Sequence, residues 1–302
     1  MEDEFKKYSY LHFLNSGKTY NNYLDYINLT ILENKWPILN KYLDISFLLN
    51  HYNLFKISIN SIDNNVDEKF RDIIQWGDAY ISKNTLEQYS ALFNFFIVNN
   101  ISNFENSIGM DFGSGLGFST INYSLYKPKK IYATDFRDKE VFDYYINDCK
   151  LFIKSNIEIE YIQNNSNNKL FNTNINNLDW IIAYDVLCCI PRKENDTYHS
   201  SLCNYLIYFY KILNLKGILF IGDWEQCNPN YKASKDKLQF HSHSIQSYDS
   251  DFDNGRISAP NYSHLLTQTE MCKILEIIGF KNIKLYHYGY ETNQRYYILC
   301  NK

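Results

Sequence analysis

The chain has 302 residues, 45% of them hydrophobic and 21% charged, which is the composition of a folded globular protein rather than a disordered one. Its net charge of −4 gives no sign of the basic surface that a nucleic-acid partner requires. The seven cysteines form no C-x-x-C pair and are odd in number, which favours the reducing cytoplasm. With no signal peptide and no run of 18 apolar residues, we expect neither a membrane span nor a membrane partner.

Residues 1–106 are rich in aromatic residues and short of glycine, and helical periodicity is clearest in "TLEQYSALFNFFIVNNI". Thr85 and Gln88 have the spacing of a capping box, which predicts that a helix begins just after Thr85. We expect this segment to be a helical extension that caps the following domain. The aromatic residues of "WGDAY" (76–80) would then cover the site, although aromatic residues at helical spacing are at least as typical of core packing.

From residue 107 to 302, short apolar strands alternate with helices, which predicts an α/β domain with a mainly parallel sheet. A second capping box, Thr267 with Glu270, predicts the start of the last helix. The chain then closes with segments 281–289 and 295–302, which read as an antiparallel hairpin. Residues 225–266 form a long irregular stretch, and such a stretch inside a compact domain is typical of a binding loop.

The most informative motif is "DFGSGLG", in which an apolar strand ends in Asp111 and three glycines follow at alternate positions. Glycines between a strand and a helix allow a ligand to approach the backbone closely. The nicotinamide-dinucleotide pattern G-x-G-x-x-G places its third glycine one residue later than Gly117. The phosphate-binding pattern G-x-x-x-x-G-K-[ST] requires a lysine that is missing here.

The motif instead resembles the first motif of the class I S-adenosylmethionine-dependent methyltransferases. Asp135 follows 24 positions after Asp111 at the end of "IYATD", where the family has an acid that accepts hydrogen bonds from both ribose hydroxyls. "LDWIIAYDVLCCIP" and "KGILFIGDW" resemble the fourth and fifth strands of the family. The resemblance covers about residues 107–302. It implies a Rossmann-like seven-stranded sheet with a reversed C-terminal strand, S-adenosylmethionine as cofactor, and these cofactor-binding residues: Asp111, Gly113, Gly115, Gly117, Asp135, Phe136 and Asp185.

Methyl transfer needs alignment above all, and a base only where the acceptor is poorly ionised. Histidine is the usual base near neutral pH, and His241, His243 and His264 lie in the irregular stretch that we expect to form the acceptor pocket. Asp185 and Asp223 follow strands whose ends face the same edge. Either could contact cofactor or acceptor, or serve only as a turn carboxylate.

We expect no metal site, because "HSH" lacks a third ligand nearby and "DSDFDNG" lacks the glycine and the acid of a calcium loop. The sequence thus predicts a cytoplasmic methyltransferase that acts on the oxygen or nitrogen of a small molecule. A protein or RNA methyltransferase and a non-catalytic S-adenosylmethionine-binding module remain alternatives. The acceptor and the oligomeric state are not defined by the sequence.

Overall fold

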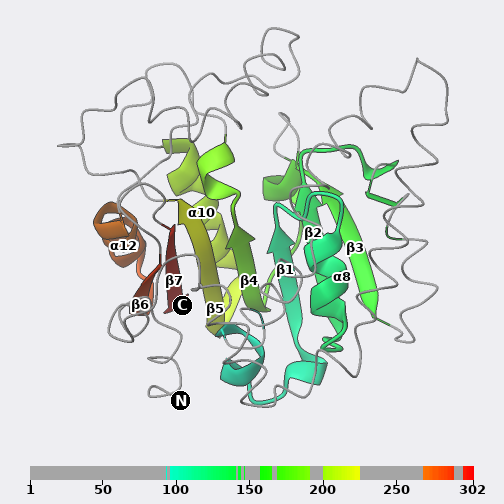
Figure 1. The fold of residues 1–302 in the computed structure, drawn as a ribbon, viewed down its shortest axis with the longest axis horizontal. Coiled ribbons are helices and arrows are strands. Elements are labelled where there is room, and N and C mark those ends of the chain that lie inside the picture. The colour runs from blue at the N-terminus through cyan, green and yellow to red at the C-terminus, as the bar shows by residue number, and fades with distance from the viewer. Residues whose placement is uncertain are drawn as a thin grey trace, which may run out of the picture. The chain divides into compact units, whose positions relative to one another are not determined.

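The computed structural model of the chain describes residues 93, 96–140, 142–143, 146, 157–164, 169–190, 200–224, 268–288 and 295–302 (Figure 1). These residues form seven strands: β1 (Ile108–Phe112), β2 (Lys130–Asp135), β3 (Glu158–Gln163), β4 (Leu178–Tyr184), β5 (Leu213–Trp224), β6 (Lys281–Tyr288) and β7 (Arg295–Asn301). Three α-helices have both ends within the described residues: α8 (Phe118–Ser124), α10 (Ser200–Ile212) and α12 (Gln268–Ile278). The short 3-10 turns are η2 (Val98–Asn100), η3 (Phe104–Asn106), η4 (Lys169–Asn172) and η5 (Leu187–Cys189).

The strands form one mixed sheet in the order β3-β2-β1-β4-β5-β7-β6. β1 pairs with β2 and β2 with β3 in parallel, whereas β7 runs antiparallel to both β5 and β6. Because β7 lies between β5 and β6, the last strand of the chain is inserted in reverse into an otherwise parallel order. The predicted α/β fold with a reversed C-terminal strand is confirmed, and so is the terminal hairpin.

The described chain divides into two compact units, one ending at Ile181 and the other beginning at Ile182. The first contains β1, β2, β3 and α8. Its core is aromatic: Trp180 is fully buried, and the ring of Phe93 packs edge-on against it at 5.1 Å. Gly109 makes this packing possible, because a Cβ atom at that position would lie 1.9 Å from the Trp180 ring. The Trp180 indole donates a hydrogen bond of 3.1 Å to the Ser107 hydroxyl, so its buried N–H group is satisfied.

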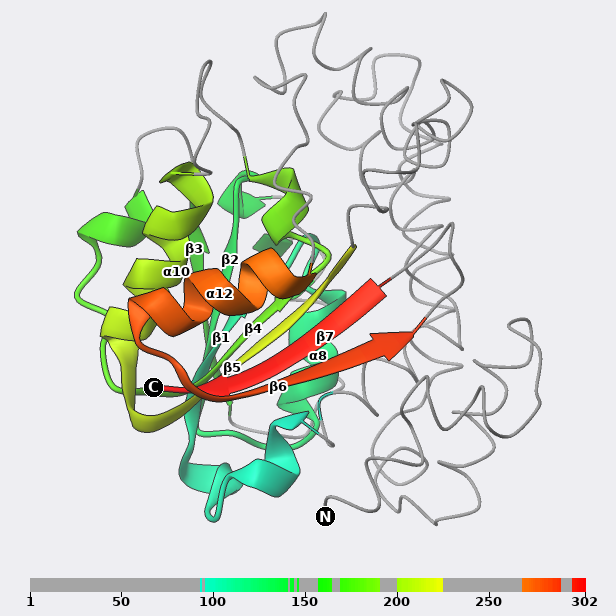
Figure 2. The same cartoon turned by 90° about the vertical axis from the view of Figure 1, so that its left-hand side faces the viewer.

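The second unit contains β5, β6, β7, α10 and α12. Figure 2 shows α10 and α12 on the same side of these strands, and the two helices contact each other. α12 begins at Gln268, directly after the expected cap residue, and ends at Ile278, after which Gly279 has a φ of +113° that suits glycine. The N–H of Phe280 returns to the carbonyl of Leu275 at 3.0 Å and so closes the helix.

Several predicted segments lie outside the described residues. They include most of the extension 1–106 with "WGDAY", and all of 225–266. Phe93 and Phe96, from the helix expected after Thr85, are helical and buried. In the described part of the chain, no helix is long and apolar enough to cross a membrane.

Candidate cofactor site

The glycine loop joins the end of β1 to the start of α8. Gly113, Gly115 and Gly117 have φ angles of +82°, +55° and +93°, all in the left-handed region that residues with a side chain rarely adopt. The alternation of glycines in the sequence therefore has a backbone cause, since each glycine supports one reversal in the turn. The loop therefore connects the end of β1 to the start of α8 with only five residues.

The N–H groups of this loop are directed into the protein. Those of Gly113 and Ser114 both donate to the Thr134 carbonyl, at 2.8 and 2.9 Å, and that of Gly117 donates to the Ser114 carbonyl at 2.8 Å. The N–H of Gly115 donates to Oδ2 of Asp135 at 2.9 Å. A phosphate-binding loop needs such groups free to point at the anion. This loop does not present these four groups to a phosphate.

The glycines differ in what surrounds them. A Cβ atom at Gly117 would lie 2.5 Å from Ile146 and 2.8 Å from Phe142, so this glycine is required for packing. A Cβ atom at Gly115 would have no described atom within 4 Å. Close packing therefore explains Gly117, whereas Gly115 faces open space in the described part of the structure.

Asp111 ends the predicted strand motif and is buried. Its Oδ2 accepts hydrogen bonds from the hydroxyls of Ser119, at 2.7 Å, and Thr120, at 2.6 Å. Burial raises the pKa of the Asp111 carboxyl to about 6, although the two hydroxyl donors act in the opposite direction. The carboxylate thus fixes the start of α8 to β1, a role that the adjacent Ser and Thr in "GFST" could have suggested.

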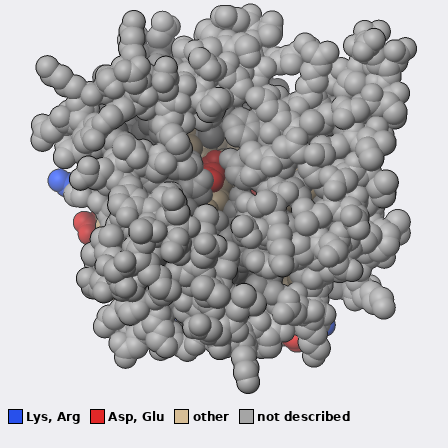
Figure 3. All heavy atoms as spheres, viewed as in Figure 1, with Lys and Arg blue, Asp and Glu red and all other residues tan. Residues whose placement is uncertain are grey.

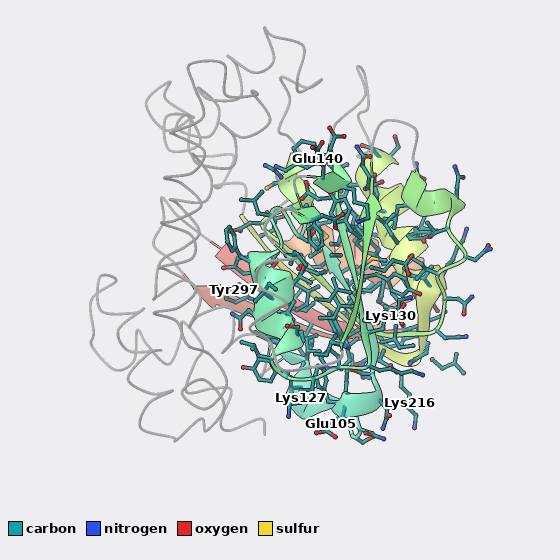
Figure 4. The ribbon with its side chains drawn as sticks, turned by 90° about the vertical axis from the view of Figure 1, so that its right-hand side faces the viewer. Glu105, Lys127, Lys130, Glu140, Lys216 and Tyr297 are labelled. Carbon is teal, nitrogen blue, oxygen red and sulfur yellow. The ribbon has the colours of Figure 1, made fainter. Side chains whose placement is uncertain are left out.

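Asp135 lies at the carboxyl end of β2, the edge at which open α/β sheets bind ligands. Figure 4 shows this orientation, with Lys130, the first residue of β2, toward the opposite end of the unit from Glu140. Oδ1 of Asp135 accepts hydrogen bonds from Arg137, from the backbone N–H at 3.2 Å and from Nη1 at 2.9 Å. Oδ2 of Asp135 accepts a hydrogen bond from the N–H of Gly115. One carboxylate therefore connects the second strand's end to the glycine loop.

The residue after this acid, Phe136, is 51% exposed, which is unusual for a large apolar side chain at a strand end. The guanidinium carbon of Arg137 lies 4.6 Å from the centre of the Phe136 ring, so one face of the ring carries a cation. The buried Tyr161 hydroxyl donates to the Arg137 carbonyl at 2.6 Å and holds the backbone of this turn. Sequence reasoning missed both Arg137 and Tyr161, and only the position of the arginine two residues after the acid could have indicated it.

The second unit carries the other strand-end acids. Asp185 has a φ of +51°, which Asp tolerates better than most residues, and its N–H donates to the Gly222 carbonyl at 2.8 Å. Asp223 is buried, and its Oδ2 accepts a hydrogen bond from the N–H of Cys188 at 3.0 Å. This bond favours a structural role for Asp223, the holding of the turn that follows β4. His241, His243 and His264 lie outside the described residues.

Solved structures show which fold this is. At a TM-score of 0.50 and 11% identity, 74% of this chain matches 54% of phosphoethanolamine N-methyltransferase 2 from Haemonchus contortus, in complex with phosphomonomethylethanolamine and S-adenosylhomocysteine. With the strand order above, this match shows the fold of the class I S-adenosylmethionine-dependent methyltransferases, as the sequence predicts. This chain thus spans little more than half of that protein.

Two further matches have lower scores. 1,6-didemethyltoxoflavin-N1-methyltransferase from Burkholderia thailandensis matches at 11% identity and a TM-score of 0.46, over 78% of this chain and 86% of its own. The CMeT domain of the citrinin polyketide synthase matches at 16% identity and a TM-score of 0.48, over 76% of this chain and 56% of its own. No protein-family model and no curated protein sequence matches the chain.

Proposed function

We propose that this protein is an S-adenosylmethionine-dependent methyltransferase that acts on the oxygen or nitrogen of a small molecule. The observation that carries the proposal is the linked geometry of Gly115 and Asp135. A glycine with open space at its Cβ position donates its N–H to a strand-end carboxylate, which in turn retains acceptor capacity for a sugar hydroxyl. Such an edge suits a nucleoside that carries no phosphate.

Two further features near the glycine loop and the end of β2 bear on this cofactor. The buried hydroxyls of Ser114 and Thr134 have no hydrogen-bond partner among the described residues. Buried polar groups are usually satisfied, so these two hydroxyls are unusual, but both are covered by protein and would have to become exposed to reach a ligand. The exposed face of the Phe136 ring can stack on a base. Together Phe136 and Asp135 offer an aromatic surface and a carboxylate acceptor.

S-adenosylmethionine would supply an activated methyl group on its sulfonium, so the protein would contribute mainly alignment. In this proposal Asp135 accepts a hydrogen bond from the ribose, Phe136 packs on the adenine, and Gly113, Gly115 and Gly117 allow close approach. Asp111 orients α8 beside the loop, and Asp185 lies at the end of β4. The backbone N–H groups of the loop donate hydrogen bonds within the protein. This is compatible with S-adenosylmethionine, because the cofactor carries no phosphate that would need them.

The remaining parts of the proposal rest on the sequence. Residues 1–106 would cap the domain, 225–266 would form the acceptor pocket, and His241, His243 or His264 would accept the acceptor's proton. The odd number of cysteines supports the cytoplasm as its location. A small acceptor rather than RNA is supported by the net charge. Figure 3 colours only a few described Lys, Arg, Asp and Glu side chains on this face.

Calorimetry with S-adenosylmethionine, S-adenosylhomocysteine and NAD tests the cofactor assignment. We expect the first two to bind and NAD not to bind. Asp135→Ala should weaken S-adenosylhomocysteine binding by about 1.5–3 kcal/mol, which is typical of a hydrogen bond to a charged group. Lys139→Ala, which removes a surface cation paired with Asp143, is the control and should bind normally. Preferential binding of NAD, or an unchanged affinity in the Asp135 variant, would show the assignment to be wrong.

Methyl transfer is tested separately from cofactor binding. The protein should convert S-adenosylmethionine to S-adenosylhomocysteine in the presence of a pool of small-molecule acceptors, measured by mass spectrometry. Conversion only with added protein or RNA would favour the macromolecular alternative. Tight binding without conversion under any condition would favour a non-catalytic module.

A further inference from the structure

The acceptor capacity of the Asp135 carboxylate can be counted. An ionised carboxylate offers about four lone-pair sites, two on each oxygen. Both sites on Oδ1 are used by Arg137, through its N–H at 3.2 Å and its Nη1 at 2.9 Å. One site on Oδ2 is used by the N–H of Gly115 at 2.9 Å. With respect to the part of the chain that the structure describes, one site is left, and it is on Oδ2.

The side chain of Arg137 is held where it is by several contacts. Its guanidinium forms an ion pair with Asp135 and lies over the Phe136 ring. The backbone carbonyl of Arg137 accepts a hydrogen bond from the Tyr161 hydroxyl, which fixes the main chain below the side chain. The ion pair is largely shielded from water, since the Arg137 side chain is 17% exposed and that of Asp135 is 6% exposed. A charge-assisted bond in such surroundings is stronger than one at the surface. The Nη1 donor therefore competes directly with any ligand hydroxyl for Oδ1.

We infer that Asp135 accepts only one ribose hydroxyl, on Oδ2 beside Gly115, because Arg137 occupies Oδ1 in place of the other. This inference rests on the proposed function and refines it. It differs from the pattern that the sequence resemblance implies, in which the acid takes both hydroxyls. Arg137 is thereby a specificity-determining residue: it decides how many hydroxyls of the sugar the protein recognises.

The test compares S-adenosylhomocysteine with its 2′-deoxy and 3′-deoxy forms by calorimetry. In the wild-type protein, we expect one deoxy form to bind roughly 10- to 100-fold more weakly, as for loss of a hydrogen bond to a charged group. The other deoxy form should bind within about threefold of S-adenosylhomocysteine, since its missing hydroxyl has no acceptor on Asp135.

Substitution of Arg137 should change this pattern. Arg137→Met keeps the aliphatic stem and the backbone N–H but removes the Nη1 donor, so one site on Oδ1 becomes available and both deoxy forms should lose affinity. Arg137→Lys retains a cationic donor and should keep the wild-type pattern. Lys139→Met removes a neighbouring cation that contacts Asp143 rather than Asp135, and it should also leave the pattern unchanged.

The outcomes separate the two proposals. Tight binding of S-adenosylhomocysteine with equal losses for both deoxy forms, or with no loss for either, would overturn the inference and leave the proposed function standing. An Arg137→Met protein with the wild-type pattern would overturn it as well. If a folded wild-type protein bound no S-adenosylhomocysteine at all, the proposed function would fall and the inference with it.

Discussion

Gly115 and Gly117 share a sequence motif and a left-handed backbone, yet they differ in what a side chain would meet. At Gly117 a Cβ atom would collide with Ile146 and Phe142, whereas at Gly115 it would meet no described atom. A motif alone cannot separate these cases, because both glycines satisfy the same spacing. Substitutions at Gly117 should lower the stability of the fold. Substitutions at Gly115 should lower both stability, through the positive φ angle, and ligand affinity.

Gly115→Val should abolish S-adenosylhomocysteine binding, because its side chain would enter the space that the proposed cofactor needs. The positive φ angle adds a backbone cost of about 1–2 kcal/mol. Gly279→Ala, at a φ of +113° after α12, gives an upper limit for this cost, because its Cβ atom would also lie 3.1 Å from the Tyr210 hydroxyl. Calorimetry and thermal melts of both variants check the prediction: a folded Gly115→Val protein with normal affinity would contradict it.

Asp111 should make stability depend on pH. Burial raises the pKa of its carboxyl from 3.8 to about 6 in the folded protein, so the folded state binds the proton more tightly than the unfolded state does. Stability from this group is therefore present at low pH, falls as pH rises from about 4 to 6, and is level above that. The shift corresponds to about 3 kcal/mol.

Asp111→Asn removes this dependence, since Asn keeps an oxygen for the hydroxyls of Ser119 and Thr120 but does not ionise. Relative to the variant, wild-type protein should lose about 3 kcal/mol of unfolding free energy between pH 4 and pH 7, measured by urea denaturation. Parallel pH profiles for the two proteins would mean that Asp111 titrates normally.

At the scale of elements, the contact between β1 and β4 depends on a glycine within a strand. Gly109 lies against the ring of Trp180, which also packs against Phe93 and hydrogen-bonds to Ser107. The sequence predicts both strands, but it gives no reason to pair this glycine with that tryptophan. Such pairings depend on which strands become neighbours, and local periodicity does not contain that information.

Gly109→Ala should destabilise the protein by about 1–3 kcal/mol or more, since its Cβ atom has no room beside Trp180. Trp180→Leu should also destabilise the protein, through a cavity. In the double variant the cost of the added methyl should be much smaller, because the two residues are in contact. Denaturant melts of the four proteins give the coupling energy, and strictly additive losses would contradict this explanation.

The residues at the strand ends were predicted only in part from the sequence. The alternation of strands and helices, the terminal hairpin and the strand-end acid Asp135 follow from local patterns, whereas the reversed C-terminal strand was implied by the family resemblance. The contacts of Arg137 could not be predicted, because the sequence does not show which way a long side chain turns at a strand end. The role of Asp111 in fixing α8 was open for the same reason, since the motif shows an acid but not its partners.

At the scale of the whole molecule, the proposed function puts cofactor binding and proton removal in different parts of the chain. The glycine loop and Asp135 belong to the unit that ends at Ile181, while His241, His243 and His264 belong to residues 225–266, outside the described part of the chain. If one of these histidines is the base, its replacement by Ala should lower turnover by about 10²–10⁴-fold. Affinity for S-adenosylmethionine should stay near that of the wild type.

Measurement of turnover and affinity for the three single variants, once an acceptor is known, checks this separation. Full turnover in all three would remove histidine from the mechanism and leave alignment of an already ionised acceptor. A loss of affinity that parallels the loss of turnover would place the histidine at the cofactor instead.

The inward direction of the loop's N–H groups has a consequence for selection among metabolites. Adenosine is the common part of many cellular molecules, and most of the abundant ones carry a chain of phosphates. A loop whose N–H groups already donate to Thr134, Ser114 and Asp135 gives those phosphates little to bind. Discrimination against nucleoside triphosphates would then need no blocking residue, because the backbone has already used the donors by which other glycine loops capture them.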